Sequence, residues 1–178
     1  MSKIGKKNIL VPNDVKVEII DNKINLEGPK GKKSIEINKE YLNVTFSDGK
    51  ISVTPKDPKN QNKIIWGLQR SLINNAVIGV GKGYTETLKL NGVGFRANLK
   101  DKQLQLQLGF SHDIFYNISE GISIKVDKQT TIVISGVDKE LVGKTVADIK
   151  FYKPVEPYKQ KGITSEGQFI LKKEGKKK

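Results

Sequence analysis

The chain contains no cysteine and only one histidine, His112, among its 178 residues. Without cysteine the protein can form neither a disulfide nor a thiolate-bound metal site, and a reducing compartment fits this composition. A single histidine leaves little of the nitrogen and sulfur chemistry that zinc and related metals require. We therefore expect no metal and no cofactor.

Long apolar runs are also missing. No stretch approaches the roughly 20 apolar residues that a membrane-spanning helix needs. The first residues, MSKIGKKNILVPNDV, show neither the apolar run of a signal peptide nor the arginine-rich pattern of a transit peptide. We expect a soluble protein with no membrane partner.

Residue patterns that would indicate catalysis are weak. Ser111, His112 and Asp113 are adjacent in GFSHD, but neighbours on an extended segment point to opposite faces and cannot form a triad. The segment GVGFRA, residues 92–97, has the spacing of a dinucleotide-binding loop. The sequence after it predicts a hairpin, whereas such a loop needs a helix there. We expect no enzymatic activity and no small-molecule substrate.

Acidic residues are outnumbered, with 19 against 32 lysines and arginines, so the net charge is +13. Residues 150–178 hold nine lysines and three glutamates, which gives this stretch +6 of that total. A surface dominated by positive charge attracts polyanions, above all nucleic acids. A solubilising tail would carry the same charge. However, Pro154 and Pro157 fix the backbone and Gly162 permits a tight turn, which favours a binding segment of fixed shape.

The first half of the chain alternates apolar and polar residues, as half-buried strands do. Asp48 and Gly49 predict a hairpin turn between two of these strands, because both residues tolerate positive φ. Apolar residues then recur at helical spacing from Ile65 to Val80. The predicted strands lie near residues 15–19, 24–26, 35–37, 42–46 and 51–53, and the predicted helix has Ile65, Leu68, Leu72, Ile73, Ala76 and Val80 on one face and stops at Gly79, Gly81 and Gly83.

The second half repeats this order of strands followed by one helix. Strands are predicted near residues 88–90, 104–108, 114–118, 122–126 and 132–134, and the helix has Val142, Val146 and Ile149 on one face. We expect an α+β protein of two similar small domains, residues 1–82 and 83–178, each an antiparallel sheet packed with one main helix. Trp66 is interpreted as a core residue, and Phe95 is left open between core packing and base stacking.

Several motifs resemble one known family, in the same order and at similar spacing. They are GPKG at residues 28–31, NGVGFRA at 91–97, LGFSH at 108–112, GVDKELVGKTVADI at 136–149, EPYKQKGI at 156–163 and the terminal KKEGKKK. Together they resemble the bacterial-type large-subunit ribosomal protein six family. The resemblance implies a two-domain protein that binds large-subunit ribosomal RNA near the stalk base and the sarcin–ricin loop, beside neighbouring ribosomal proteins, in the ribosomes of a bacterial cytoplasm or an organelle.

This sequence departs from the family at the segment that the resemblance places on the RNA. Family members usually read RPPEPYKGKGI there. Here Lys153 replaces an arginine, Val155 a proline and Gln160 a small residue. Lysine keeps the positive charge of arginine but loses its planar fork, which can hold a phosphate through two hydrogen bonds.

The candidate RNA contacts combine the charged segment with these motifs. Lysines are assigned to phosphates, Pro157 and Gly162 to the shape of the turn, and Tyr158 to a stacking or 2′-hydroxyl contact, with a buried turn anchor as its alternative. A general nucleic-acid-binding architectural protein is the alternative function, because charge alone would allow it. The predicted contact residues are Gly92, Gly94, Arg96, Ser111, His112, Lys150, Lys153, Pro157, Tyr158, Lys159, Lys161, Gly162, Lys172, Lys173, Lys176, Lys177 and Lys178.

Overall fold

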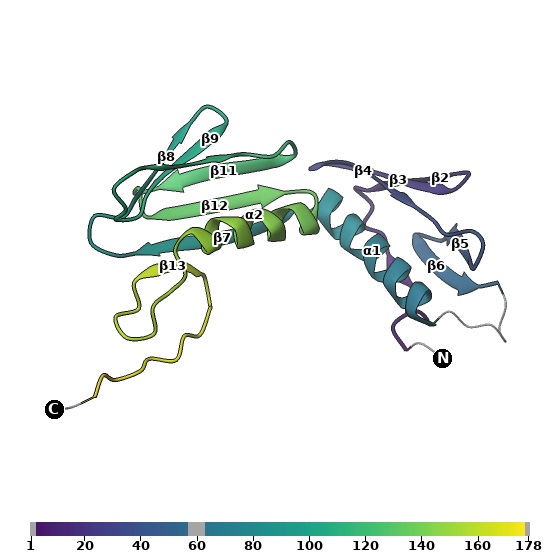
Figure 1. Ribbon diagram of the computed structural model, residues 1–178. Coiled ribbons are helices and arrows are strands. Elements are labelled where there is room, and N and C mark those ends of the chain that lie inside the picture. The colour runs from purple at the N-terminus through teal and green to yellow at the C-terminus, as the bar shows by residue number, and fades with distance from the viewer. Residues whose placement is uncertain (1–2, 57–62, 177–178) are drawn as a thin grey trace. The chain divides into compact units, whose positions relative to one another are not determined.

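A computed structural model describes residues 3–56 and 63–176, so the predicted contacts Lys177 and Lys178 lie outside the described residues. The described part contains two helices and thirteen strands, all paired antiparallel, which confirms the predicted α+β class (Figure 1). The chain divides into two compact units. The first comprises the residues up to Gly83 together with Val137–Lys139, and the second comprises Tyr84–Gly136 and the residues from Glu140 onward.

The first unit contains two three-stranded sheets and one helix. The sheets have the strand orders β1-β6-β5 and β2-β3-β4. The elements are β1 (Ile9–Leu10), β2 (Lys16–Ile20), β3 (Lys23–Gly28), β4 (Gly31–Glu36), β5 (Leu42–Ser47), β6 (Lys50–Pro55) and α1 (Lys63–Gly81).

Two predicted turns shape this unit. Asp48 and Gly49 both adopt positive φ, +48° and +68°, between β5 and β6, as the hairpin prediction required. Gly28 ends β3 against the end of α1, where an added Cβ would lie 2.7 Å from a methyl group of Val80. The amide of Lys30 donates to the carbonyl of Val80 at 3.0 Å, so the GPKG turn also satisfies a backbone group at the helix end.

Helix α1 is rotated relative to the predicted face. Trp66 is buried, as predicted, and its indole N–H donates to the carbonyl of Val53 at 2.7 Å. The buried amide of Gln69 donates to the carbonyl of Glu36, also at 2.7 Å. Because these two side chains face the core, Leu68 points away and is 57% exposed, so its predicted burial was wrong. Gly79 lies inside the helix and does not stop it; the turn out of α1 comes at Gly83, which has φ +80°.

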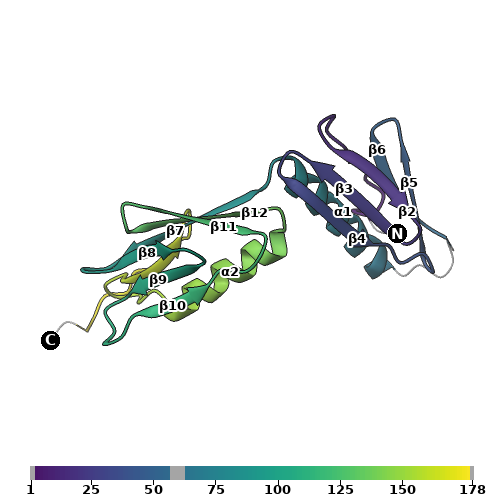
Figure 2. The same ribbon diagram turned by 90° about the horizontal axis from the view of Figure 1, so that it is seen from above.

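The second unit also contains two sheets and one helix, whereas the sequence pattern predicted one sheet. A four-stranded sheet has the order β11-β12-β7-β13, and a three-stranded sheet has the order β10-β9-β8, with these last three strands side by side in Figure 2. The elements are β7 (Tyr84–Asn91), β8 (Arg96–Lys100), β9 (Gln103–Gln107), β10 (Ile114–Asn117), β11 (Ile122–Asp127), β12 (Thr131–Gly136), α2 (Lys139–Tyr152) and β13 (Gly162–Ser165).

One core joins the two sheets and α2 of this unit. Leu88 and Ile132 contribute from the larger sheet, Leu106 from the smaller sheet, and Val142 and Ile149 from α2, all buried. The helix face predicted from residues 142, 146 and 149 therefore faces the core. Of the described helices, neither is long and apolar enough to cross a membrane.

Phe95 belongs to this core and is therefore not a free stacking surface. Two glycines make room for its ring. A Cβ added at Gly92 would lie 2.6 Å from the ring, and one added at Gly109 would lie 3.3 Å from it. The glycines of NGVGFRA and LGFSH thus let two loops close over one buried aromatic side chain.

Candidate nucleic-acid interface

A closed turn carries six of the seventeen predicted contacts. Residues 153–163, called the basic turn below, connect the end of α2 to β13. Three backbone hydrogen bonds close it: the Ile163 amide donates to Lys153 O at 3.0 Å, the Glu156 amide to Lys161 O at 2.9 Å, and the Gln160 amide to Glu156 O at 2.9 Å. With Pro154 and Pro157 fixing φ as well, the turn has one defined backbone path.

Gly162 is the tightest position of the basic turn. It is buried and has φ +141°, a value that side-chain-bearing residues rarely adopt. A Cβ here would lie 2.7 Å from Cα of Val155 and 2.8 Å from the carbonyl oxygen of Pro154. Both neighbours are backbone atoms that cannot swing aside, so the two arms of the turn approach as closely as they do only because residue 162 is glycine.

The backbone conformation at Gln160 explains why a small residue is usual at this position in the family. Its φ is +55°, in the left-handed region where a small residue without Cβ is at ease. A glutamine there costs about 1 kcal/mol relative to glycine. The turn keeps this conformation because its three hydrogen bonds and the close packing at Gly162 determine the backbone around it.

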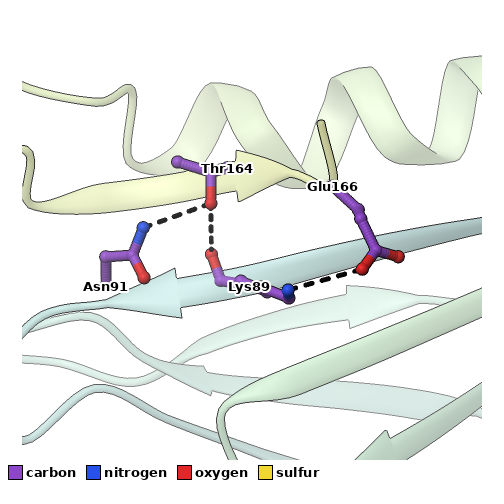
Figure 3. A network of polar contacts seen from close by, with 4 residues as sticks. All are labelled: Lys89, Asn91, Thr164 and Glu166. Atoms are coloured by element: carbon purple, nitrogen blue, oxygen red, sulfur yellow. Dashed lines mark hydrogen bonds and ion pairs between the residues drawn. The ribbon is translucent and has the colours of Figure 1, made fainter. Parts of the chain in front are cut away.

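Strand β13 anchors the basic turn to the larger sheet. It pairs with β7, where Gly162 lies opposite Asn91. Figure 3 shows the side chains along this pairing: the Asn91 amide donates to the Thr164 hydroxyl at 3.2 Å, and that hydroxyl donates to the carbonyl of Lys89 at 3.3 Å. The ammonium of Lys89 lies 3.4 Å from the carboxylate of Glu166. The pairing also places Asn91 next to the base of the basic turn, at the start of the loop that contains Gly92 and Gly94 and leads to Arg96 in β8.

Lys150 has a role inside the protein. From the last turn of α2, its half-buried ammonium donates to the Ser165 hydroxyl at 3.1 Å and to the Gln168 side-chain oxygen at 2.7 Å. The backbone amide of Gln168 donates to the backbone carbonyl of Ser165 at 3.1 Å. Lys150 thus holds the turn from which the C-terminal tail starts, and its charge is shared with these acceptors.

The tail returns to the basic turn. The amide of Lys173 donates to the carbonyl of Pro157 at 3.0 Å. Two segments that are separate along the sequence therefore form one surface. Tyr158 lies on this surface and is 50% exposed, so it is not a buried anchor. The exposed lysines that this surface collects are Lys159, Lys161, Lys172, Lys173 and Lys176.

A second loop meets the start of the basic turn. The ammonium of Lys153 lies 4.2 Å from the centroid of the Phe110 ring, within the range of a cation–π interaction. The Phe110 and His112 rings stack at 6.2 Å with an angle of 21° between their planes. Ser111 and His112 are exposed, as RNA contacts would have to be. Sequence reasoning missed Phe110, although it is an aromatic residue beside two predicted contacts.

The remaining predicted residues have different surroundings. Gly94 has φ +78° with open space around it, and Arg96 is exposed at the start of β8. Gly92 packs on Phe95 and serves the core. The geometry thus unites the basic turn, the tail and the loop containing Phe110, with the loop of Gly94 and Arg96 beside them.

One protein family model matches the chain twice. The model of the ribosomal protein L6 family matches residues 11–83 and again residues 91–166, one match for most of each unit. The chain belongs to the ribosomal protein L6 family. Its two matches confirm the two similar domains that the repeated order of strands and helix predicted.

Relatives in this L6 family resemble the chain over its entire length. The large ribosomal subunit protein uL6 of Zymomonas mobilis subsp. mobilis is 46% identical over 180 residues, and that of Bartonella quintana is 46% identical over 178 residues. That of Sphingopyxis alaskensis is 43% identical over 178 residues, and each pairing covers 100% of both chains. The tail after residue 166 lies beyond the family match but within these full-length similarities.

Proposed function

We propose that this protein is a structural, non-catalytic constituent of the large ribosomal subunit, where it binds large-subunit ribosomal RNA near the stalk base and the sarcin–ricin loop. Membership of the L6 family supports this proposal, since its full-length relatives are named as large-subunit proteins. The sites of contact on the RNA follow from the resemblance of the quoted motifs.

The strongest structural support for the proposal is the hydrogen bond between the Lys173 amide and the Pro157 carbonyl, which joins the tail to the basic turn. It gathers exposed lysines from two segments on one surface of fixed backbone. Lysines on such a surface release counterions condensed on RNA phosphates, which provides affinity that depends on salt. A rigid backbone decides how closely folded RNA can approach, and folded RNA is recognised largely by its shape.

Residues 83–178 are the proposed RNA-binding domain and residues 1–82 the proposed outer domain, which would face neighbouring ribosomal proteins. The basic turn, the tail and both loops of the candidate interface lie in residues 83–178. In this scheme Lys159, Lys161, Lys172 and Lys173 contact phosphates, Tyr158 stacks or meets a 2′-hydroxyl, and Lys150 and Gly162 hold the surface in shape.

Binding to two nucleic acids at matched salt separates this function from a general architectural one. We expect the full-length protein to bind large-subunit ribosomal RNA more tightly than duplex DNA at every salt concentration, with the preference preserved as salt rises. Equal affinity for both, with the same dependence on salt, would support the architectural alternative instead.

A further inference from the structure

The outer face of the β8-β9-β10 sheet is polar and separate from the basic turn. Side chains alternate across a strand, and the register puts Ala97, Leu106 and Ile114 on one face, toward the core. The opposite face carries two cations, five side-chain amides and one aromatic ring, and none of its strand positions is acidic.

Hydrogen bonds hold the amides of this face in place. Gln105, only 9% exposed although it faces outward, donates to the Asp113 carboxylate at 2.6 Å, and Gln107 donates to the same oxygen at 3.3 Å. Gln103 donates to the side-chain oxygen of Asn117 at 2.9 Å. Asp113 is the one carboxylate at this edge, and its charge is engaged by two amides. The side-chain oxygens of Gln103 and Gln107, which are exposed and half-buried, remain as acceptors for an incoming group.

Phe115 is the aromatic residue of this face. It lies directly opposite Gln105 in the register and is 54% exposed. Arg96 and Lys100 lie on the same face of β8. Both are exposed, and their charged groups form no hydrogen bond or ion pair with the other residues that the structure describes. The sheet therefore offers an aromatic surface, fixed amides and two cations together.

We propose that this face binds unpaired nucleotides of RNA, with one base stacked on Phe115 and with Arg96 and Lys100 near the adjoining phosphates. This proposal rests on the proposed function, and it names unpaired RNA nucleotides as the ligand of a second surface, the outer face of the β8-β9-β10 sheet. Sheets that bind single-stranded RNA use exposed aromatic rings to stack bases, while side-chain amides contact the base edges. The positive charges and the lack of acidic strand positions complement the phosphate backbone.

The position of the face supports the same occupant. Asp113, which fixes Gln105 and Gln107, directly follows His112 in the loop that meets the basic turn. Arg96 adjoins the loop of Gly94, which lies next to the base of that turn. RNA held at the candidate interface would thus have strands within reach of this sheet.

Phe115→Leu tests the proposal in the full-length protein. The probes are a fluorescein-labelled oligouridylate and the same oligonucleotide annealed to its complement, measured by fluorescence anisotropy. We expect Phe115→Leu to weaken binding of the single strand about five- to tenfold, because one stacked base is lost. Duplex binding and the salt dependence of both should stay the same, and Phe115→Tyr should bind like the parent.

Phe46→Leu is the matched control, since Phe46 is 43% exposed on β5 of the first unit. It should leave single-strand binding unchanged. The proposal is wrong if Phe115→Leu binds the single strand like the parent, or if it weakens single strand and duplex equally. These outcomes are independent of the preference of the unmodified protein for large-subunit ribosomal RNA, on which the proposed function depends.

Discussion

Replacing Gly162 with alanine should open the basic turn while the rest of the fold persists. The added Cβ would lie 2.7 Å from Cα of Val155 and 2.8 Å from the Pro154 carbonyl oxygen, and the residue would keep a φ of +141°. Backbone strain of this kind costs about 1–3 kcal/mol, and overpacking costs about 1–3 kcal/mol more. Alanine recovers about 0.4–1 kcal/mol by restricting the unfolded chain. The net loss should be about 1–5 kcal/mol.

Gly167→Ala is the control for this variant. Gly167 also has positive φ, +74°, but a Cβ there would meet nothing within 4 Å. Its backbone strain of about 1–2 kcal/mol is partly offset by the same effect on the unfolded chain, so about 1 kcal/mol should be lost. The difference between the two alanine variants measures the close approach at Gly162 together with the different strain of its φ.

Hydrogen exchange is the appropriate assay, because the expected opening is local. In Gly162→Ala, the amides of Glu156, Gln160 and Ile163, which close the turn, should lose protection by a factor of about 5 to 5,000. The single tryptophan, Trp66, is buried in the first unit and reports its unfolding separately by fluorescence. Its urea midpoint should not change. If both alanine variants lose the same protection, the close contacts at Gly162 do not hold the turn, and our account of its shape is refuted.

Three further predictions concern the same surface. Replacing Lys159 and Lys161 with glutamine should flatten the slope of log affinity against log salt by about 1.4–1.8, because each lost phosphate contact contributes about 0.7–0.9. The slope is measured by RNA filter binding. An unchanged slope would show that neither lysine contacts the RNA. Gln160→Gly should stabilise the turn by about 1 kcal/mol, since glycine adopts φ +55° without strain. Slower hydrogen exchange of the Glu156 and Ile163 amides, which close the same turn, would show it, whereas faster exchange would contradict it. Lys150→Gln should loosen the Ser165–Gln168 turn and weaken RNA binding, but it should change the salt slope less than replacing Lys159 or Lys161 does. A slope change as large as that of one phosphate contact would instead show that Lys150 contacts the RNA directly.

Local sequence patterns predicted the elements whose signals are local. The Asp48–Gly49 turn adopts the two positive φ values that its residue types favour. The face of α2 follows from the spacing of residues 142, 146 and 149, and the strands around residues 122–134 follow from strict alternation. In each case the residues that decide the structure are neighbours along the chain.

Features decided by distant partners could not be predicted. The rotation of α1 depends on Trp66 and Gln69 finding backbone carbonyls on β6 and at the end of β4, which spacing within the helix does not reveal. The burial of Gln105 on β9 also depends on a partner outside its strand, because the Asp113 carboxylate accepts its hydrogen bond.

The candidate interface shows the same division. Charge and the proline and glycine positions identified the basic turn from the sequence. The contact of Lys153 with Phe110 and the bonds of Lys150 to Ser165 and Gln168 depend on how β13 pairs with β7. A count of lysines treats Lys150 and Lys159 alike, whereas the structure bonds one internally and exposes the other.

Sedimentation with ribosomal subunits in high salt tests the central claim most directly. The account predicts that the full-length protein sediments with the large subunit and not with the small subunit. It should stay bound through a high-salt wash, because a fixed surface as well as charge holds it there, and Gly162→Ala should be released by the same wash. A protein that sediments with both subunits alike and is released as salt rises, whether or not Gly162 is intact, would contradict the account.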